Sequence, residues 1–138
     1  PIAGERVFFQ PQAAGCYKCH RISALGGSTG PDLTFAGKSM TREKLVDSIL
    51  DPSKEIAPMY TAFRITMRDG KERTAIFAGE THDSLVTLVD STGKVDKVRR
   101  TDIEERTALR ESIMPDNLPA QMTRKEFLDL IAFLMERR

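Results

Sequence analysis

Two cysteines and a histidine stand close together near the start of the chain, in the run Cys16-Tyr17-Lys18-Cys19-His20. Two thiols separated by two residues and followed at once by a histidine are typical of c-type haem attachment. In that chemistry each thiol adds to one vinyl group of the porphyrin, and the adjacent imidazole reaches the iron from the same side. The spacing therefore predicts covalent haem, with Cys16 and Cys19 as attachment points and His20 as an axial ligand.

Two other chemistries use cysteines at this spacing. A redox-active pair, as in thioredoxin-like folds, normally lies near a βαβ pattern, whereas residues 21–29 predict a small-residue loop. A zinc or iron–sulfur site of the usual kind needs four ligands. The chain has two cysteines, and the only other histidine, His82, stands at an unusual spacing. Both alternatives explain the motif less well than haem attachment does.

An iron that carries electrons without changing its coordination needs a second axial ligand, and methionine sulfur is a common one. The chain has six methionines, of which Met59 and Met114 stand beside proline in predicted loops. The backbone there is extended, so a side chain can project into a cavity. We favour Met114, which shortly precedes the last predicted helix, and keep Met59 and the turn residue His82 as alternative ligands.

Three segments carry helical patterns. Residues 2–10 place apolar side chains at helical spacing and end before Pro11. A second helix is expected from Thr41, a good N-cap residue, to Leu50. The third begins with the capping box Thr123-Arg124-Lys125-Glu126, and its apolar stripe comprises Phe127, Leu130, Ile131 and Leu134.

Between the second and third helices the hydrophobic period changes from about 3.6 to about 2 residues. Four or five short strands are expected from Tyr60 to about Thr107, with a hairpin turn at Asp69-Gly70. An open two-stranded ribbon would be only marginally stable. We therefore expect a small antiparallel barrel or a curled sheet.

Composition limits the classes of function. The chain has 138 residues, of which 40% are hydrophobic and 30% charged, as in an ordinary globular protein. The net charge of +1 implies neither nucleic acid nor an anionic membrane as a partner. No apolar run approaches the length of a membrane span, and no signal peptide opens the chain. Because covalent haem attachment occurs outside the bacterial cytoplasm, we expect a periplasmic or otherwise extracytoplasmic location and a mature fragment or excised domain.

The chain resembles class I cytochromes c. Gly4 and Phe8 match the Gly-x-x-x-aromatic pattern of their first helix, residues 16–20 match the haem motif, and residues 130–134 match the last helix. More narrowly, it resembles the haem-binding domain of planctomycete and verrucomicrobial proteins. The matching segments are Gly26-Gly27, Gly30 to Thr34, Leu50 to Ser53, Ile56 to Pro58, the β segment from Tyr60, and Ser112 to Pro115.

The resemblance implies a mainly α cytochrome c fold around a covalent haem, with the small antiparallel barrel or curled sheet inserted, α+β overall. Residues 1–59 and 108–138 would form the haem domain. Residues 60–107 would form the inserted β subdomain.

The resemblance also implies roles for single residues. They are thioethers at Cys16 and Cys19, axial ligation by His20 and Met114, and a bond from the other imidazole N–H to the backbone carbonyl of Pro31. Such a bond orients a ligating histidine and raises its basicity. One departure is Met59, at a position that is often glycine in relatives.

The expected function is that of a monohaem c-type cytochrome domain, with one haem c per chain. It would carry single electrons between a dehydrogenase, fused to it or separate, and a respiratory acceptor, and it would not itself be an enzyme. A small peroxidase is an alternative, but it needs a distal acid or base, and no convincing distal histidine is present. A gas or redox sensor, in which a ligand displaces Met114, is the other alternative.

Overall fold

The computed structural model describes residues 2–138. They divide into two compact units, of which the first comprises Pro1–Lys54 and Pro115–Arg138 and the second is the continuous segment Glu55–Met114. The predicted β subdomain, residues 60–107, lies within the second unit. Over residues 2–138, no helix has the length and apolar character needed to cross a membrane.

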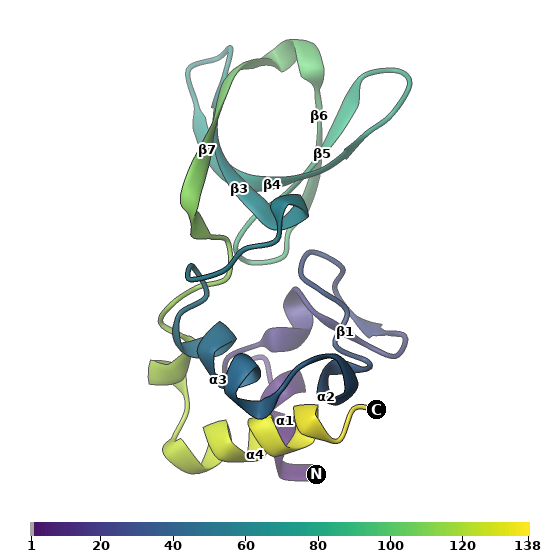
Figure 1. The fold of residues 1–138 in the computed structure, drawn as a ribbon. Helices are drawn as coiled ribbons and strands as arrows, with labels where there is room; N and C mark the ends of the chain where they lie inside the picture. The colour runs from purple at the N-terminus through teal and green to yellow at the C-terminus, as the bar shows by residue number, and fades with distance from the viewer. Residues whose placement is uncertain (1) are drawn as a thin grey trace. The chain divides into compact units, whose positions relative to one another are not determined.

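The first unit is built mainly from helices (Figure 1). Its elements are α1 Ile2–Phe9, the 3₁₀ turn η1 Cys16–Lys18, the two-residue strands β1 Arg21–Ile22 and β2 Leu25–Gly26, α2 Ala36–Ser39, α3 Arg42–Leu50, η4 Leu118–Gln121 and α4 Arg124–Met135. Strands β1 and β2 pair antiparallel as a short hairpin.

Helices α1 and α4 approach each other closely at Gly4. A Cβ atom on Gly4 would lie 2.0 Å from the backbone oxygen of Asp129, so the approach requires a residue without a side chain. Phe8 of α1 packs against Phe133 of α4, with 6.1 Å between the ring centroids, and both side chains are buried. The first and last helices of the unit are thereby held together.

Side-chain caps mark where two of these helices begin. The Thr123 hydroxyl accepts a bond of 3.2 Å from the Glu126 N–H, and the Thr123 N–H donates to the Glu126 carboxylate at 2.7 Å. Thr41 accepts a bond of 3.2 Å from the Lys44 N–H. The predicted capping box and the predicted N-cap at Thr41 are both confirmed.

The second unit is a five-stranded antiparallel sheet in the order β6-β5-β4-β3-β7. Its elements are η2 Pro58–Tyr60, β3 Thr61–Met67, β4 Glu72–Glu80, β5 Leu85–Val89, β6 Val95–Arg99, η3 Arg100–Asp102 and β7 Ile103–Ser112. Figure 1 shows the sheet curling strongly, with β6 and β7 at its two edges. Of the two forms expected from the alternating pattern, a small barrel or a curled sheet, the structure has the curled sheet.

Alternate residues of the strands make the core of this unit, because successive side chains of a strand point to opposite faces. The buried members are Ile65, Met67, Ala75, Val86 and Leu88, and the partly buried ones are Phe63, Phe77, Val98 and Ile103. The turn at Asp69-Gly70 joins β3 to β4, as predicted.

The prediction of a mainly α fold is wrong. The structure is α+β, with 34% helix, a five-stranded antiparallel sheet and a two-stranded sheet. The sheet takes up more of the chain than the alternation indicated, because β7 continues past residue 107 and pairs with β3 as far as Ser112. The helices of the first unit are short, so helix makes up only about a third of the chain.

Candidate haem-attachment site

The cysteine–histidine motif folds into a tight turn. Both the Cys19 N–H and the His20 N–H donate to the Cys16 carbonyl, at 3.2 Å and 2.9 Å. Gly15, just before the turn, has a φ of 62°, a left-handed conformation that favours glycine. The backbone thus brings the two thiols and the imidazole into one turn.

The His20 side chain is oriented by the backbone of Pro31. Its Nδ1 lies 2.8 Å from the Pro31 carbonyl oxygen, the contact that the family resemblance implied. Because a carbonyl can only accept, Nδ1 carries the proton and Nε2 presents its lone pair. Burial lowers the pKa of His20 and the bond to Pro31 opposes that effect, with a net lowering. The imidazole is therefore neutral at neutral pH, the form that binds a metal.

Gly30 lies directly against the imidazole. A Cβ atom on Gly30 would lie 2.6 Å from Cε1 of His20 and 2.8 Å from Nδ1, far inside normal contact. The neighbouring loop is equally close to the motif, because a Cβ on Gly26 would lie 2.2 Å from the His20 carbonyl oxygen. Sequence reasoning gave Gly30 no separate role. The imidazole of His20 can occupy this position only because residue 30 is glycine and has no side chain.

The cysteines do not resemble a redox-active pair. Burial raises the pKa of the Cys16 thiol to about 11, a backbone hydrogen bond opposes the rise, and the charge of Cys19 adds to it. Redox-active pairs instead have a cysteine of lowered pKa, which is a thiolate at neutral pH. Over the part of the chain that the structure describes, no three His, Cys, Asp or Glu side chains gather into a group that could hold a metal ion. The thioredoxin-like and zinc alternatives thus gain no support.

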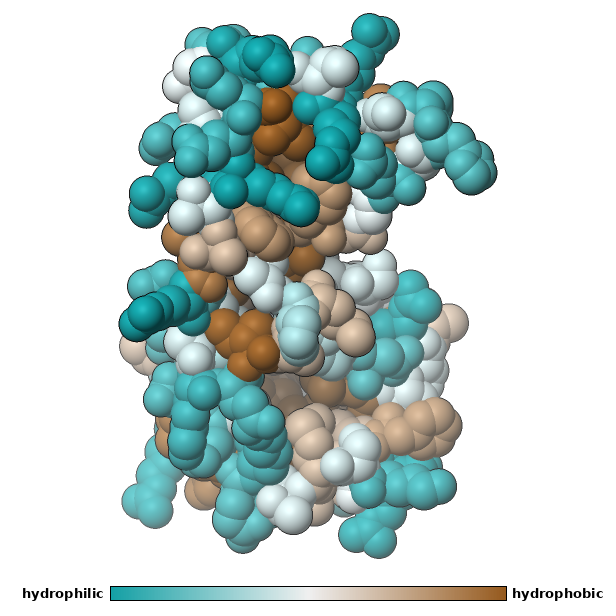
Figure 2. All heavy atoms as spheres, turned by 45° about the horizontal axis from the view of Figure 1, so that its top comes forward, coloured by the Kyte–Doolittle hydropathy of each residue, from teal (hydrophilic) through white to brown (hydrophobic). Residues whose placement is uncertain are grey.

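Two apolar side chains in the segments that follow the motif are exposed. Leu25, in the hairpin after His20, is 65% exposed, and Phe35, which follows the Pro31 segment, is 59% exposed. Figure 2 shows a face of the molecule that is largely hydrophilic, with smaller apolar areas. Single exposed apolar side chains are common on protein surfaces and do not by themselves mark a site, but a porphyrin is a large apolar ring against which such side chains can pack. Together with two thiols and a neutral imidazole, these side chains are compatible with the predicted haem.

The three candidates for the second axial ligand all belong to the second unit. Met114 is its last residue, half-buried, with its N–H donating to the Ser112 hydroxyl at 3.1 Å. Met59 lies in η2 and is 72% exposed, and His82 is exposed in the turn between β4 and β5. The structure thus brings His20 and Pro31 together within the unit that holds Cys16 and Cys19, whereas the role of each candidate stays a prediction.

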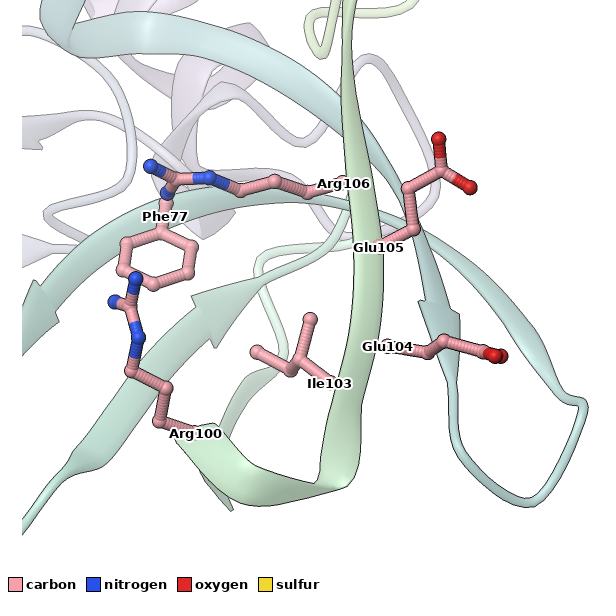
Figure 3. A pocket seen from close by; sticks show the side chains of 6 residues that line it. All are labelled: Phe77, Arg100, Ile103, Glu104, Glu105 and Arg106. Atoms are coloured by element: carbon pink, nitrogen blue, oxygen red, sulfur yellow. The ribbon is translucent and has the colours of Figure 1, made fainter.

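The second unit carries a depression of about 160 Å³ beside β7. Its lining residues are Phe77, Arg100, Ile103, Glu104, Glu105 and Arg106. The Arg106 guanidinium lies 4.5 Å from the ring centre of Phe77 and 5.1 Å from that of Phe63. Figure 3 shows Arg106 reaching over Phe77 while Glu104 and Glu105 point to the other side of the strand. The arginine therefore covers two aromatic rings at the rim of the core, which is a structural role.

No protein-family model matches the chain, and no curated protein shows significant similarity to it. The function is therefore argued from the chemistry of the residues themselves.

Proposed function

We propose that this chain is a haem c-binding electron-transfer module related to the class I cytochromes c. Cys16 and Cys19 would hold the porphyrin through thioethers, and His20 would ligate the iron. The observation that supports this best is the state of His20. Its imidazole is neutral, its Nδ1–H is engaged by Pro31, and its Nε2 is available, one turn from two thiols.

A bound haem supplies reversible one-electron chemistry. The chain supplies the surroundings. The Pro31 carbonyl orients the imidazole and raises its basicity, which favours donation from Nε2. Gly30 leaves room for the imidazole, since a Cβ there would collide with it, and Leu25 and Phe35 would offer exposed apolar surface to the porphyrin.

Met114 is our proposed second axial ligand, with Met59 and His82 as alternatives. A thioether favours ferrous iron and raises its reduction potential. The electron donor would be a dehydrogenase and the acceptor a respiratory protein, in a compartment outside the cytoplasm. The chain itself would perform no substrate chemistry.

The first test is covalent haem. The protein is produced with the haem c maturation machinery and separated under denaturing conditions, and haem is detected in the protein band. Wild-type protein should retain haem, and the double variant Cys16→Ser, Cys19→Ser should lose all of it. Wild-type protein that folds but retains no haem would refute the proposal.

The second test identifies the axial ligand by absorption spectroscopy. We expect a low-spin spectrum with the weak far-red sulfur-to-iron band, unchanged by carbon monoxide in the reduced form. Met114→Ala should remove the band, and Met59→Ala is the matched control that should keep it. Ready binding of carbon monoxide by wild-type protein would contradict the electron-carrier proposal and favour a sensor or an enzyme.

A further inference from the structure

The segment that contains Pro31 is tied to the segment that contains His20. Two backbone bonds of 2.8 Å connect them, Gly30 N–H to the Cys19 carbonyl and Leu33 N–H to the Arg21 carbonyl. The side-chain bond from His20 to Pro31 lies between these two along both segments. The position of the Pro31 carbonyl thus depends on the hydrogen bonds that hold residues 30–34 against the His20 segment.

A third tie is made by a side chain, the hydroxyl of Thr34. Its oxygen accepts a bond of 2.7 Å from the Ser23 N–H, in the turn of the β1–β2 hairpin, and the hydroxyl donates to the Asp32 carboxylate at 2.5 Å. The same carboxylate oxygen accepts the Thr34 N–H at 2.8 Å. One hydroxyl therefore links the hairpin to the residue that follows Pro31.

The directions of these bonds are determined by chemistry. The Ser23 N–H can only donate, so the Thr34 oxygen accepts from it. The bonds from Thr34 hold the pKa of Asp32 below its usual range, so its carboxylate is ionised at neutral pH and can only accept. The Thr34 hydroxyl is consequently used both as donor, to Asp32, and as acceptor, from Ser23.

We infer that Thr34 is a positioning residue for His20: bonded to Ser23 and Asp32, its hydroxyl holds the Pro31 carbonyl at Nδ1 of the imidazole. The consequence for the iron depends on the proposed function. The geometric claim concerns this chain alone. Without the hydroxyl, residues 30–34 lose their bond to Ser23 in the hairpin and keep the two backbone bonds to the His20 segment, and the bond to Nδ1 weakens.

A weaker bond to Nδ1 makes the imidazole less basic and a poorer donor. Ferric iron, which gains more from a basic ligand than ferrous iron does, is then stabilised less. The midpoint potential of a haem held by His20 should therefore rise when the hydroxyl of Thr34 is removed.

The test compares Thr34→Val, which removes the hydroxyl at similar volume, with Thr34→Ser, which keeps it. The whole chain carries ¹⁵N-labelled histidine, and the exchange of the His20 Nδ1 proton is followed by NMR, with and without haem. Thr34→Val should exchange about tenfold faster than wild type, as expected from weakening one hydrogen bond. Thr34→Ser should restore slow exchange, and in haem-loaded protein only Thr34→Val should raise the midpoint potential.

Thr81 offers a matched control in the second unit. Its hydroxyl donates to Asp83 at 2.5 Å, and its oxygen accepts the Leu85 N–H at 3.2 Å. Thr81→Val removes the same kind of link and should leave both the exchange and the potential unchanged. Asp32→Ala removes the carboxylate that accepts the Thr34 hydroxyl, and it should accelerate exchange as Thr34→Val does. It serves as the second variant if Thr34→Val folds poorly.

The outcomes separate the two proposals. Unchanged exchange in Thr34→Val and Asp32→Ala would overturn the positioning role, whether or not haem is bound. Wild-type protein without haem would refute the proposed function, while exchange of the His20 proton would still decide the role of Thr34.

Discussion

The two units use glycine in opposite ways. In the first unit a Cβ atom would collide with backbone or ring atoms at 2.0 to 2.6 Å, at Gly4, Gly26, Gly27, Gly30 and Gly37. In the second unit a Cβ on Gly70 would meet nothing within 4 Å. Glycine is favoured there only because the hairpin turn requires a φ of +86°. Close backbone approaches at glycine therefore distinguish the first unit, which also has an apolar core that includes Phe8 and Phe133, whereas the core of the second unit is a cluster of alternating apolar side chains.

This difference predicts which substitutions should destabilise each unit. A unit that depends on backbone contact should tolerate added atoms poorly at its glycines. A unit that depends on a side-chain cluster should tolerate removed atoms poorly in its core. Four substitutions test this contrast, each followed by urea unfolding with amide NMR signals assigned to each unit.

Gly4→Ala should have the largest effect. The new Cβ would meet the Asp129 carbonyl of α4 at 2.0 Å, and a backbone atom cannot rotate away. We expect a loss of about 4 kcal/mol, above the usual range for overpacking. Gly70→Ala is the control, with an expected loss of about 1 kcal/mol from its left-handed conformation. Equal losses at the two positions would break the contrast.

Ile65→Ala should come next. Ile65 is fully buried in the core of the second unit, and the truncation leaves a cavity among alternating side chains. The expected loss is about 3 kcal/mol, seen in the signals of the second unit. A loss below that of the Gly70→Ala control would mean that the cluster does not hold the sheet together.

Thr123→Ala should cost about 1 kcal/mol, because it leaves the Glu126 N–H without its capping oxygen. The effect should appear in α4 and in the first unit. Thr123→Ser keeps a hydroxyl and should recover most of the loss. Failure of the serine to do so would show that the cap is not what the threonine contributes.

Arg106→Gln should have the smallest effect, about 0.5 kcal/mol. The guanidinium covers Phe63 and Phe77 at an exposed position, where such contacts are weak. Arg64→Gln, at an exposed position of β3, is the matched control and should change the free energy of unfolding still less. A loss of several kcal/mol in Arg106→Gln would place the arginine in the core instead of at its rim.

Local signals explain what could be predicted from the sequence. The starts of α3 and α4 follow from Thr41 and Thr123, because a cap needs only residues within one turn. The hairpin between β3 and β4 follows from Asp69-Gly70 for the same reason. The two cysteines and His20 are one motif, so the centre of the candidate site was visible as well.

Non-local pairing explains what could not be predicted. Most side chains of β7 are exposed, so the strand shows no alternation, and its extended state depends on pairing with β3. Strands β1 and β2 have two residues each, too few for any period. Gly30 and Thr34 act on residues about ten positions earlier, and only the spacing of Asp32 and Thr34, typical of a side-chain turn, could have pointed to their role.

The pairing of Thr61 with Ser112 has a consequence for modularity. Opposite residues of an antiparallel pair lie about 5 Å apart. The first and last strand residues of the second unit are therefore neighbours. The sheet of some fifty residues is joined to the rest of the chain at this pair, which we call the stem. An inserted segment whose two ends are neighbours requires only that the host chain place its two connecting residues close together. The entropic cost of closing such a loop grows slowly with its length. Sheets of different size and sequence can therefore be exchanged at this stem, during evolution or by design.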